Sequence, residues 1–291
     1  MTERYLNYIR QERRYSQHTF LSYQTDLFQF GEYLKNFYKN SFPQSATQEM
    51  IRSWVIELID LGVSNRTINR KLSCLKSFYK FLLKEGVVDA NPMKGIVSPK
   101  VSKRLPAFMT EEMVNLSTIP VVYDDFYSLR QSVVFEILYQ TGIRLSELIN
   151  LEVDNVDFYK QQIKVFGKRN KERLIPVSKQ LLELIKRYLD ERNECFENHS
   201  AFLIVSNKGI KTYPKFIYGS VRSQLEQLGT LSKKSPHVLR HTFATHLLNN
   251  GADINSVKEL LGHESLASTQ VYTHNTIKKL KSIYELAHPR A

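Results

Sequence analysis

Apolar side chains recur at helical spacing along most of the chain, and this periodicity limits the possible folds more than any other feature of the sequence. In the first third, the amphipathic segments end at helix-breaking residues such as Gly62 and Gly86. The period changes only near the middle, where residues 162–166 and 173–177 are predicted to be strands joined by the basic turn GKRNKE. The sequence therefore predicts a mainly α-helical protein with a small antiparallel β-sheet.

Residues 1–90 are predicted to form a small helical bundle. The first amphipathic helix has an N-cap candidate at Ser16, the second ends before Gly62, and the third runs from Ser64 to Gly86. Each has an apolar stripe suited to packing against the others. The stripes comprise Phe20, Tyr23, Leu27, Phe30 and Leu34; Met50, Ile51, Trp54, Val55, Leu58 and Ile59; and Ile68, Leu72, Leu75, Phe78, Tyr79 and Leu82.

The opposite face of the third helix is polar and basic. It is either a surface that contacts phosphates or an ordinary solvated helix face, and its composition alone favours neither. The candidates for DNA contact on this face are Arg66, Asn69, Arg70, Lys76 and Lys80.

Residues 91–106 are predicted to be a basic linker, because the breakers Gly95 and Pro99 interrupt a stretch with few core-forming residues. At 291 residues the chain is long enough for about two domains, so we expect a second domain over 107–291. Its predicted helices follow Thr110 and then cover 124–141, 179–193, 213–228, 237–250, 254–261 and 276–287.

The charge of the chain favours polyanionic partners. There are 41 Lys and Arg residues against 29 Asp and Glu residues, a formal net charge of +12, which fits nucleic acid or an anionic membrane surface. No stretch approaches the roughly 20 apolar residues of a membrane span, and the N-terminus lacks the apolar segment of a signal peptide. We therefore expect a soluble cytoplasmic protein. Cys74 and Cys195 each stand alone, which predicts neither a redox pair nor a cysteine metal site.

The chemistry is predicted to lie in the second domain. His237 and Arg240 are three residues apart on one helix face, an arrangement that alone is more typical of a solvated surface than of a site. Arg144 follows the Thr141–Gly142 turn at an expected helix start, where Glu147 can brace it. Lys168 in the basic turn, His263 in LLGHES and Tyr272 in STQVYTH complete a set able to run metal-free phosphoryl transfer.

Attack on a phosphodiester requires stabilisation of charge on the nonbridging oxygens, an activated nucleophile and a proton for the leaving oxygen. Two arginines can neutralise the oxygens and favour the phenolate of a tyrosine, whose free pKa is about 10. A histidine and a lysine can move the protons. A phosphotyrosine intermediate retains the energy of the broken bond, so rejoining needs neither a nucleotide nor a metal.

The segments TGIRLSEL, GKRNKERLIP, HVLRHTFATHLLNNGAD and LLGHESLASTQVYTH resemble the catalytic blocks of the Xer type of tyrosine recombinases, in the phage integrase family, in both order and spacing. SNRTINRKLSCLKSFYKFL also resembles the SAM-like core-binding domain of that family. The resemblance implies a two-domain DNA clamp and a 3′-phosphotyrosyl intermediate. It implies catalytic roles for Arg144, Lys168, His237, Arg240, His263 and the nucleophile Tyr272, with Glu147 as the accessory acid.

One departure lies beside the implied general acid. Arg169 stands where many relatives have Gly, and Asn170 can instead supply a left-handed turn conformation, which Asn tolerates better than most residues. Lys171 is a rival to Lys168, which is preferred because it matches the family position.

Other site types and functions are less favoured. His237, His241 and His246 share a helix but lack a nearby acid or cysteine to complete a zinc site, so no metal is expected and no cofactor is implied. His241 and His246 are instead interpreted as structural or DNA-facing. A type IB topoisomerase shares the chemistry but fits the N-terminal segment less well. A non-catalytic architectural DNA-binding protein is the alternative from a different class.

The resemblance also implies a biological setting. It implies a homo- or hetero-tetramer with a second recombinase on two synapsed sites, a Holliday junction, and a DNA translocase at the division septum. The compact layout favours resolution of chromosome dimers at a dif-like site over the integrase or invertase of a mobile element. The last helix, 276–287, has apolar spacing suited either to a neighbouring subunit or to its own domain.

Overall fold

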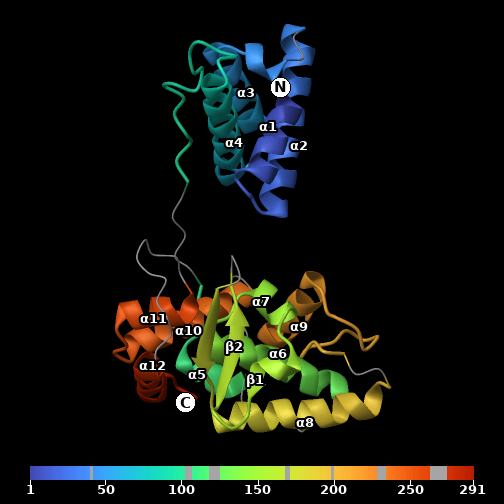
Figure 1. The fold of residues 1–291 in the computed structure, drawn as a ribbon, viewed down its shortest axis with the longest axis vertical. Helices are drawn as coiled ribbons and strands as arrows, with labels where there is room; N and C mark the ends of the chain where they lie inside the picture. The colour runs from blue at the N-terminus through green and yellow to red at the C-terminus, as the bar shows by residue number, and fades with distance from the viewer. Residues whose placement is uncertain are drawn as a thin grey trace. The chain divides into compact units, whose positions relative to one another are not determined.

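The computed structural model describes residues 1–39, 42–101, 107–117, 125–167, 171–197, 200–227, 234–262 and 274–291, with only the backbone at 116–117 and 274–279. The chain forms two compact units, Met1–Arg104 and Leu105–Ala291 (Figure 1). Each has a separate hydrophobic core. The predicted mainly helical fold with a small antiparallel sheet is confirmed. No helix in the described ranges is long and apolar enough to cross a membrane.

The N-terminal unit is a helical bundle whose helix starts are set by capping side chains. Ser16 accepts a hydrogen bond from the Thr19 amide, and Ser64 accepts one from the Thr67 amide. Such caps satisfy donors that have no partner within the helix and contribute about 1 kcal/mol each. The elements are α1 (Thr2–Gln11), α2 (Gln17–Tyr38), the 3-10 turn η1 (Pro43–Ser45), α3 (Gln48–Asp60) and α4 (Asn65–Lys84).

The core of this unit lies between α1, α2, α3 and α4. All six apolar side chains predicted to face inward from α4 are buried, and Phe30 of α2 contacts Trp54 of α3 with ring centroids 4.8 Å apart. The start of the predicted linker belongs to the same core, because Met93 and Ile96 are buried in it. This segment therefore packs on the bundle before the chain reaches the second unit.

The C-terminal unit is built around α6 (Phe126–Thr141), a helix that is buried on nearly all sides. A helix that is apolar all round must be enclosed by other elements, and α6 packs against α8, α9 and α10. The other helices are α5 (Glu111–Ser117), α7 (Leu145–Ile149), the 3-10 turn η2 (Val153–Asn155), α8 (Lys179–Cys195), α9 (Pro214–Gln227), α10 (Pro236–Asn249), α11 (Ile254–Leu261) and α12 (His274–Ala287).

The sheet has the strand order β1-β2-β3, with β1 (Val156–Asp157), β2 (Gln162–Phe166) and β3 (Glu172–Pro176). Both pairs are antiparallel, and Val165 lies opposite Arg173 in the β2–β3 register. Successive side chains alternate between the two faces of a strand, so Ile163 and Val165 point inward together with Arg173 and Ile175. The inward face of β3 therefore carries one arginine among apolar side chains.

The last helix packs on its own unit in the part whose side chains are described. Leu280, Tyr284 and Ala287 of α12 are buried in the main core, and Arg290 beyond the helix pairs with Glu136 of α6. Leu286 is 82% exposed, so an apolar side chain remains on the outer face of α12.

Candidate functional site

Arg144 is held in place by the start of α7. It is the N-cap residue of this helix, and its backbone N–H donates to Glu147 Oε2 at 2.7 Å. Its guanidinium donates to Glu147 Oε1, also at 2.7 Å. The predicted bracing of Arg144 by the carboxylate three residues later is thus present in the structure, and 32% of the Arg144 side chain stays exposed.

Arg240 lies on α10, and its guanidinium bridges two other segments. One nitrogen donates to the Gly142 carbonyl at the end of α6, and Nη2 donates to the Leu261 carbonyl at 2.8 Å. Gly142 has φ +58°, a left-handed conformation that ends α6 and turns the chain toward Arg144. The turn therefore links the positions of both predicted phosphate-binding arginines.

Three guanidinium groups converge on the C-terminal end of α11. Successive carbonyls at this end accept hydrogen bonds from Arg173 Nε at 2.9 Å, Arg240 Nη2 at 2.8 Å and Arg144 Nη2 at 2.8 Å. The acceptors are Leu260, Leu261 and Gly262, in that order. The last carbonyls of a helix lack partners within the helix and carry its partial negative charge, so cations are favoured there.

Arg173 is a site residue that the sequence analysis missed. It is 4% exposed, and its two terminal nitrogens form a bidentate pair with Glu147, from Nη1 to Oε1 at 2.9 Å and from Nη2 to Oε2 at 2.7 Å. The available signal was an arginine at an inward position of the strand ERLIP, where a charged side chain requires a buried partner.

Three predicted catalytic residues, Lys168, His263 and Tyr272, lie outside the described residues. His237 is exposed in the first turn of α10, three residues before Arg240. The chain is described up to the residue before Lys168 and up to the residue before His263. The structure thus brings together Arg144, Glu147 and Arg240. It also describes Gly167 and Gly262, the residues directly before Lys168 and His263.

Burial and neighbouring charges shift the pKa values of two members of this cluster. Burial raises the pKa of Glu147, but the hydrogen bonds and charge of Arg173, followed by those of Arg144, bring that pKa below its ordinary value. Burial, and then the charge of Arg144, lowers the pKa of Arg240 to about 10. The carboxylate and the guanidinium are therefore both charged at neutral pH, and the arginines outnumber the single carboxylate among them.

The other histidines of α10 do not form a metal site in the described structure. His246 is buried, accepts from the Tyr139 hydroxyl at Nδ1 and donates from Nε2 to the Met109 carbonyl at 2.7 Å. Both ring nitrogens are used, which confirms the structural interpretation of His246. Within the ranges described, no group of three or more His, Cys, Asp or Glu side chains is arranged to hold a metal ion.

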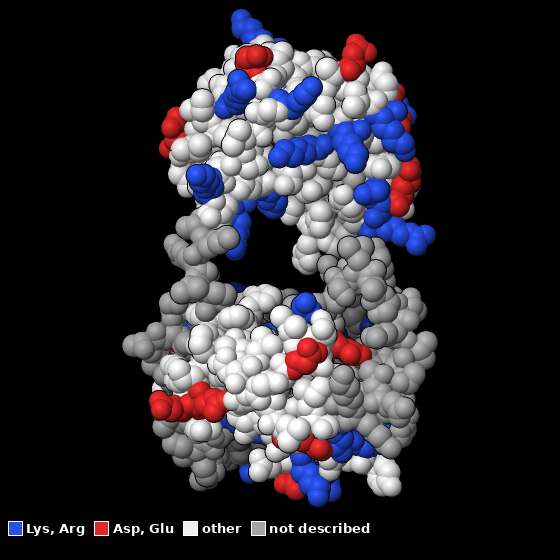
Figure 2. Space-filling view, turned by 90° about the vertical axis from the view of Figure 1, so that its left-hand side faces the viewer, with Lys and Arg blue, Asp and Glu red and all other residues white. Residues whose placement is uncertain are grey.

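The candidate DNA-binding residues of α4 differ in their surroundings. Arg66, Lys76 and Lys80 are exposed, whereas Arg70 pairs with the buried Asp26 of α2. Asn69 is half-buried and donates from Nδ2 to the Pro99 carbonyl at 3.0 Å. Figure 2 shows Lys and Arg side chains gathered on the side of the N-terminal unit where α4 lies in Figure 1.

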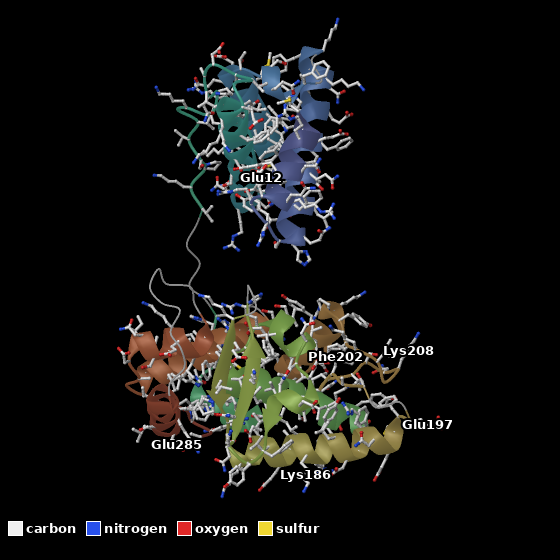
Figure 3. The ribbon with its side chains drawn as sticks, viewed as in Figure 1. Glu12, Lys186, Glu197, Phe202, Lys208 and Glu285 are labelled. Atoms are coloured by element: carbon white, nitrogen blue, oxygen red, sulfur yellow. The ribbon has the colours of Figure 1, made fainter. Side chains whose placement is uncertain are left out.

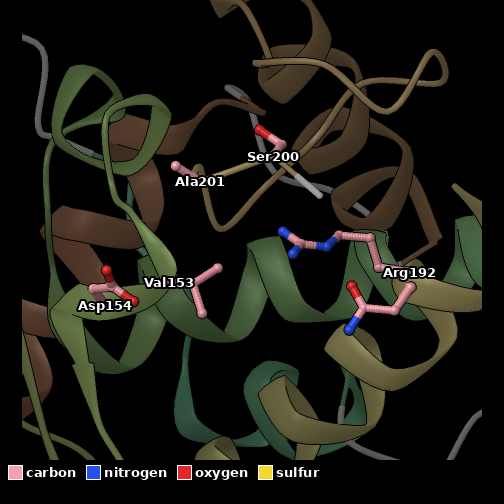
Figure 4. A pocket seen from close by; sticks show the side chains of 6 residues that line it. Val153, Asp154, Arg192, Ser200 and Ala201 are labelled. Atoms are coloured by element: carbon pink, nitrogen blue, oxygen red, sulfur yellow. The ribbon is translucent and has the colours of Figure 1, made fainter. Parts of the chain in front are cut away.

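A hollow of about 360 Å³ lies away from this cluster, between η2, the end of α8 and residues 200–201 (Figure 4). Its one guanidinium, Arg192, donates to the backbone carbonyls of Phe202 and Leu203. None of the predicted site residues lines it. The arginine cluster at the end of α11 is the better candidate, because it presents partly exposed cationic donors suited to an oxyanion such as a phosphate.

Comparisons with known proteins match a separate family model to each of the two units. Residues 106–279 match the Phage integrase family, and residues 2–86 match the Phage integrase, N-terminal SAM-like domain. A tyrosine recombinase XerC of Listeria innocua is 40% identical over 100% of this chain and 98% of its own length. The XerC of Bacillus subtilis is 36% identical over 99% and 95%.

A solved structure shares the fold. The XerH site-specific recombinase, crystallised in a post-cleavage complex with a palindromic difH substrate, aligns with a TM-score of 0.71. The alignment covers 97% of this chain and 83% of the other at 22% identity, so it supports the fold and carries no argument about the site.

Proposed function

This chain belongs to the phage integrase family and is a tyrosine recombinase, and on that premise we propose that it cleaves and rejoins duplex DNA through Tyr272. The Tyr272 oxygen attacks the scissile phosphorus, and the bond from phosphorus to the 5′ oxygen breaks. The products are a 3′-phosphotyrosyl bond and a free 5′ hydroxyl. Attack by a 5′ hydroxyl of a partner strand reverses the step, releases the tyrosine and joins the strands.

Arg144 and Arg240 bind the nonbridging oxygens of the scissile phosphate in this proposal. Their guanidiniums converge on the neighbouring carbonyls of Leu261 and Gly262 at the C-terminal end of α11, and this convergence is the observation that carries the proposal. Each retains further N–H donors beyond those bonded to carbonyls and to Glu147. Donors held in advance at the place where charge develops stabilise a transition state most effectively.

Proton transfer falls to residues around the arginines. His237, exposed on the helix of Arg240, accepts the proton of the Tyr272 hydroxyl. Lys168 donates a proton to the leaving 5′ oxygen, and His263 donates a hydrogen bond to the phosphate. Glu147 holds Arg144 through the start of α7.

We further propose that DNA contact is shared with the exposed basic side chains of α4, and that the active form is a tetramer on two sites. Resolution of chromosome dimers at a dif-like site in the cytoplasm is the favoured role, with a second recombinase and a septal translocase as partners. It is supported by the XerC relatives that match over the whole chain. A mobile-element integrase or invertase has the same chemistry and is separated by the identity of the DNA site.

The test is a nicked duplex that carries a dif-like site, because cleavage next to the nick releases a short fragment and traps the covalent product. Wild-type protein and Tyr272→Phe are compared on a denaturing gel, and binding of both is measured on a native gel. We expect a protein–DNA band from wild type alone, with equal binding by both proteins. Site-specific binding by wild type without a covalent band would favour the architectural alternative.

A further inference from the structure

We infer that Arg173 is a positioning residue for the cleavage reaction: it acts on the scissile phosphate through Glu147 and Arg144 and does not touch the DNA. The inference rests on the proposed function and adds a residue to it. Arg173 is the one member of the arginine cluster at the end of α11 that is almost wholly buried, so its guanidinium faces protein atoms.

The inward position of Arg173 in β3 is not explained by apolar packing. Arg173 points into the core, while the adjacent Leu174 is half-exposed. Burial of an arginine is unfavourable unless partners satisfy its donors, whereas burial of a leucine is favourable by itself. The inward position of this arginine is therefore explained by its polar contacts.

Those contacts join three separate parts of the unit. Arg173 grips both oxygens of Glu147 on α7, the same oxygens that accept from the Arg144 backbone and side chain. Its Nε donates to the Leu260 carbonyl of α11. A shift of Arg173 would thus move the carboxylate that orients Arg144 and the helix end that accepts from both other arginines.

Arg173 also lies against the two glycines that precede predicted catalytic residues. A methyl group added at Gly262, just before His263, would lie 3.1 Å from Arg173 Nη1. One added at Gly167, just before Lys168, would lie 3.8 Å from the same atom and 3.7 Å from Glu147 Oε1. The guanidinium therefore lies close to the residues that directly precede Lys168 and His263.

Lysine is the informative replacement. It keeps the positive charge but has donors on a single nitrogen, so it cannot match the planar arrangement that holds both carboxylate oxygens and a carbonyl. Arg173→Lys should therefore leave a charged but less firmly held Glu147. With the nicked substrate at saturating protein, we expect cleavage to slow about 10- to 100-fold, while DNA affinity is unchanged.

Arg192→Lys is the matched control. Arg192 is also buried and also donates to backbone carbonyls, but on α8, at the hollow of Figure 4. We expect it to lower the urea midpoint of the unit without slowing cleavage by the folded protein. If both variants slowed cleavage in proportion to their loss of stability, the inference would be overturned.

A neutral substrate separates positioning from a general loss of folding. In a methylphosphonate, one nonbridging oxygen of the scissile phosphate is replaced by a methyl group, so there is less charge for Arg144 to stabilise. We expect the penalty of Arg173→Lys to be several-fold smaller on this substrate than on the phosphodiester. The ratio is measured within one preparation, so any unfolded fraction cancels.

Equal penalties on both substrates would contradict positioning through Arg144, even if the variant were partly unfolded. Cleavage by wild type with unchanged cleavage by Arg173→Lys would overturn the inference and leave the proposed function intact. Absence of a covalent product from wild type would instead contradict the proposed function itself.

Discussion

Among the residues of the cluster at the end of α11, Glu147 has a pKa on which burial and neighbouring charges have opposite effects. This buried carboxylate lies against Arg173 and Arg144, which together lower its pKa even though burial acts to raise it. Its stabilising contribution is therefore present above the pKa of an unfolded glutamate and is lost as the pH falls through the lower pKa of the folded state. At neutral pH Glu147 therefore stays ionised between Arg173 and Arg144.

His288 gives the C-terminal unit a second dependence on pH. It is stacked on Tyr284 with ring centroids 4.8 Å apart and lies beside Tyr139, His246 and Arg290. Burial, with the charge of Arg290 and the nearby His246, lowers its pKa from 6.5 to about 3. The unfolded chain therefore binds a proton between these values while the folded chain does not, so stability falls as the pH falls below 6.5.

When the pH falls from 7.5 to 5.5, we expect the free energy of unfolding to decrease in both proteins. The decrease should be about 1 kcal/mol larger in wild type than in His288→Phe. Phenylalanine keeps the stacked ring but cannot titrate. Urea unfolding of both proteins at the two pH values measures the difference. Parallel losses in the two proteins would mean that His288 binds its proton in the folded state as readily as in the unfolded state.

The residues of the site differ in how far sequence could predict them. The pairing of Arg144 with Glu147 follows from their spacing of three at a helix start, and the structure has it at 2.7 Å. Alternation in ERLIP could mark Arg173 as an inward charge that requires a partner, but it could not identify Glu147 and Leu260, which lie on distant segments. Tertiary contacts decided that position, and no local pattern contains them.

At the scale of elements, helix ends were predictable where a cap or a glycine marks them. Ser64 caps the start of α4 with its side chain, and Gly142 ends α6 because a residue without a side chain adopts the left-handed conformation easily. The helix predicted over 254–261 coincides with α11. The strand β1 was missed, because two residues are too few to show an alternating period. Helix α1 was not predicted separately, and its Tyr5 and Ile9 are buried in the bundle.

Gly142 tests how tightly the α6 end is packed against the arginine cluster. Its φ is +58°, and a methyl group there would lie 2.5 Å from Phe243 Cδ1 and 3.0 Å from Leu261 Cδ2. Gly251 is also left-handed but has open space around it. We expect Gly251→Ala to cost about 1–2 kcal/mol of unfolding free energy from backbone strain alone.

For Gly142→Ala, overpacking adds about 1–3 kcal/mol to the same strain. Urea unfolding of the two variants and wild type gives the difference directly. Equal costs for the two substitutions would show that the Phe243 and Leu261 side chains move aside freely, and the turn would then not be a rigid support for Arg144.

At the scale of the whole molecule, the chain is two units with separate cores, and the basic face of α4 belongs to the N-terminal one. Lys76 and Lys80 are exposed on that face. If they contact phosphates, each releases a counterion on binding, and the double variant Lys76→Gln/Lys80→Gln should reduce the slope of log affinity against log salt by about 2.

The control for this measurement is Lys186→Gln, which removes a lysine from the outer side of α8 (Figure 3). We expect it to leave the slope unchanged when binding to a duplex is titrated over several salt concentrations. A double variant with the wild-type slope would identify the α4 face as merely solvated, which is the alternative that composition left open.

The covalent bond between Tyr272 and DNA is the decisive feature of the proposed reaction. The covalent product from the nicked duplex would be digested with nuclease and trypsin, and the peptide between Lys258 and Lys278, which contains Tyr272, would be sequenced by mass spectrometry. We predict that this peptide carries a nucleotide joined through its 3′ phosphate to Tyr272. A nucleotide on any other residue, or one joined through its 5′ phosphate, would contradict the account.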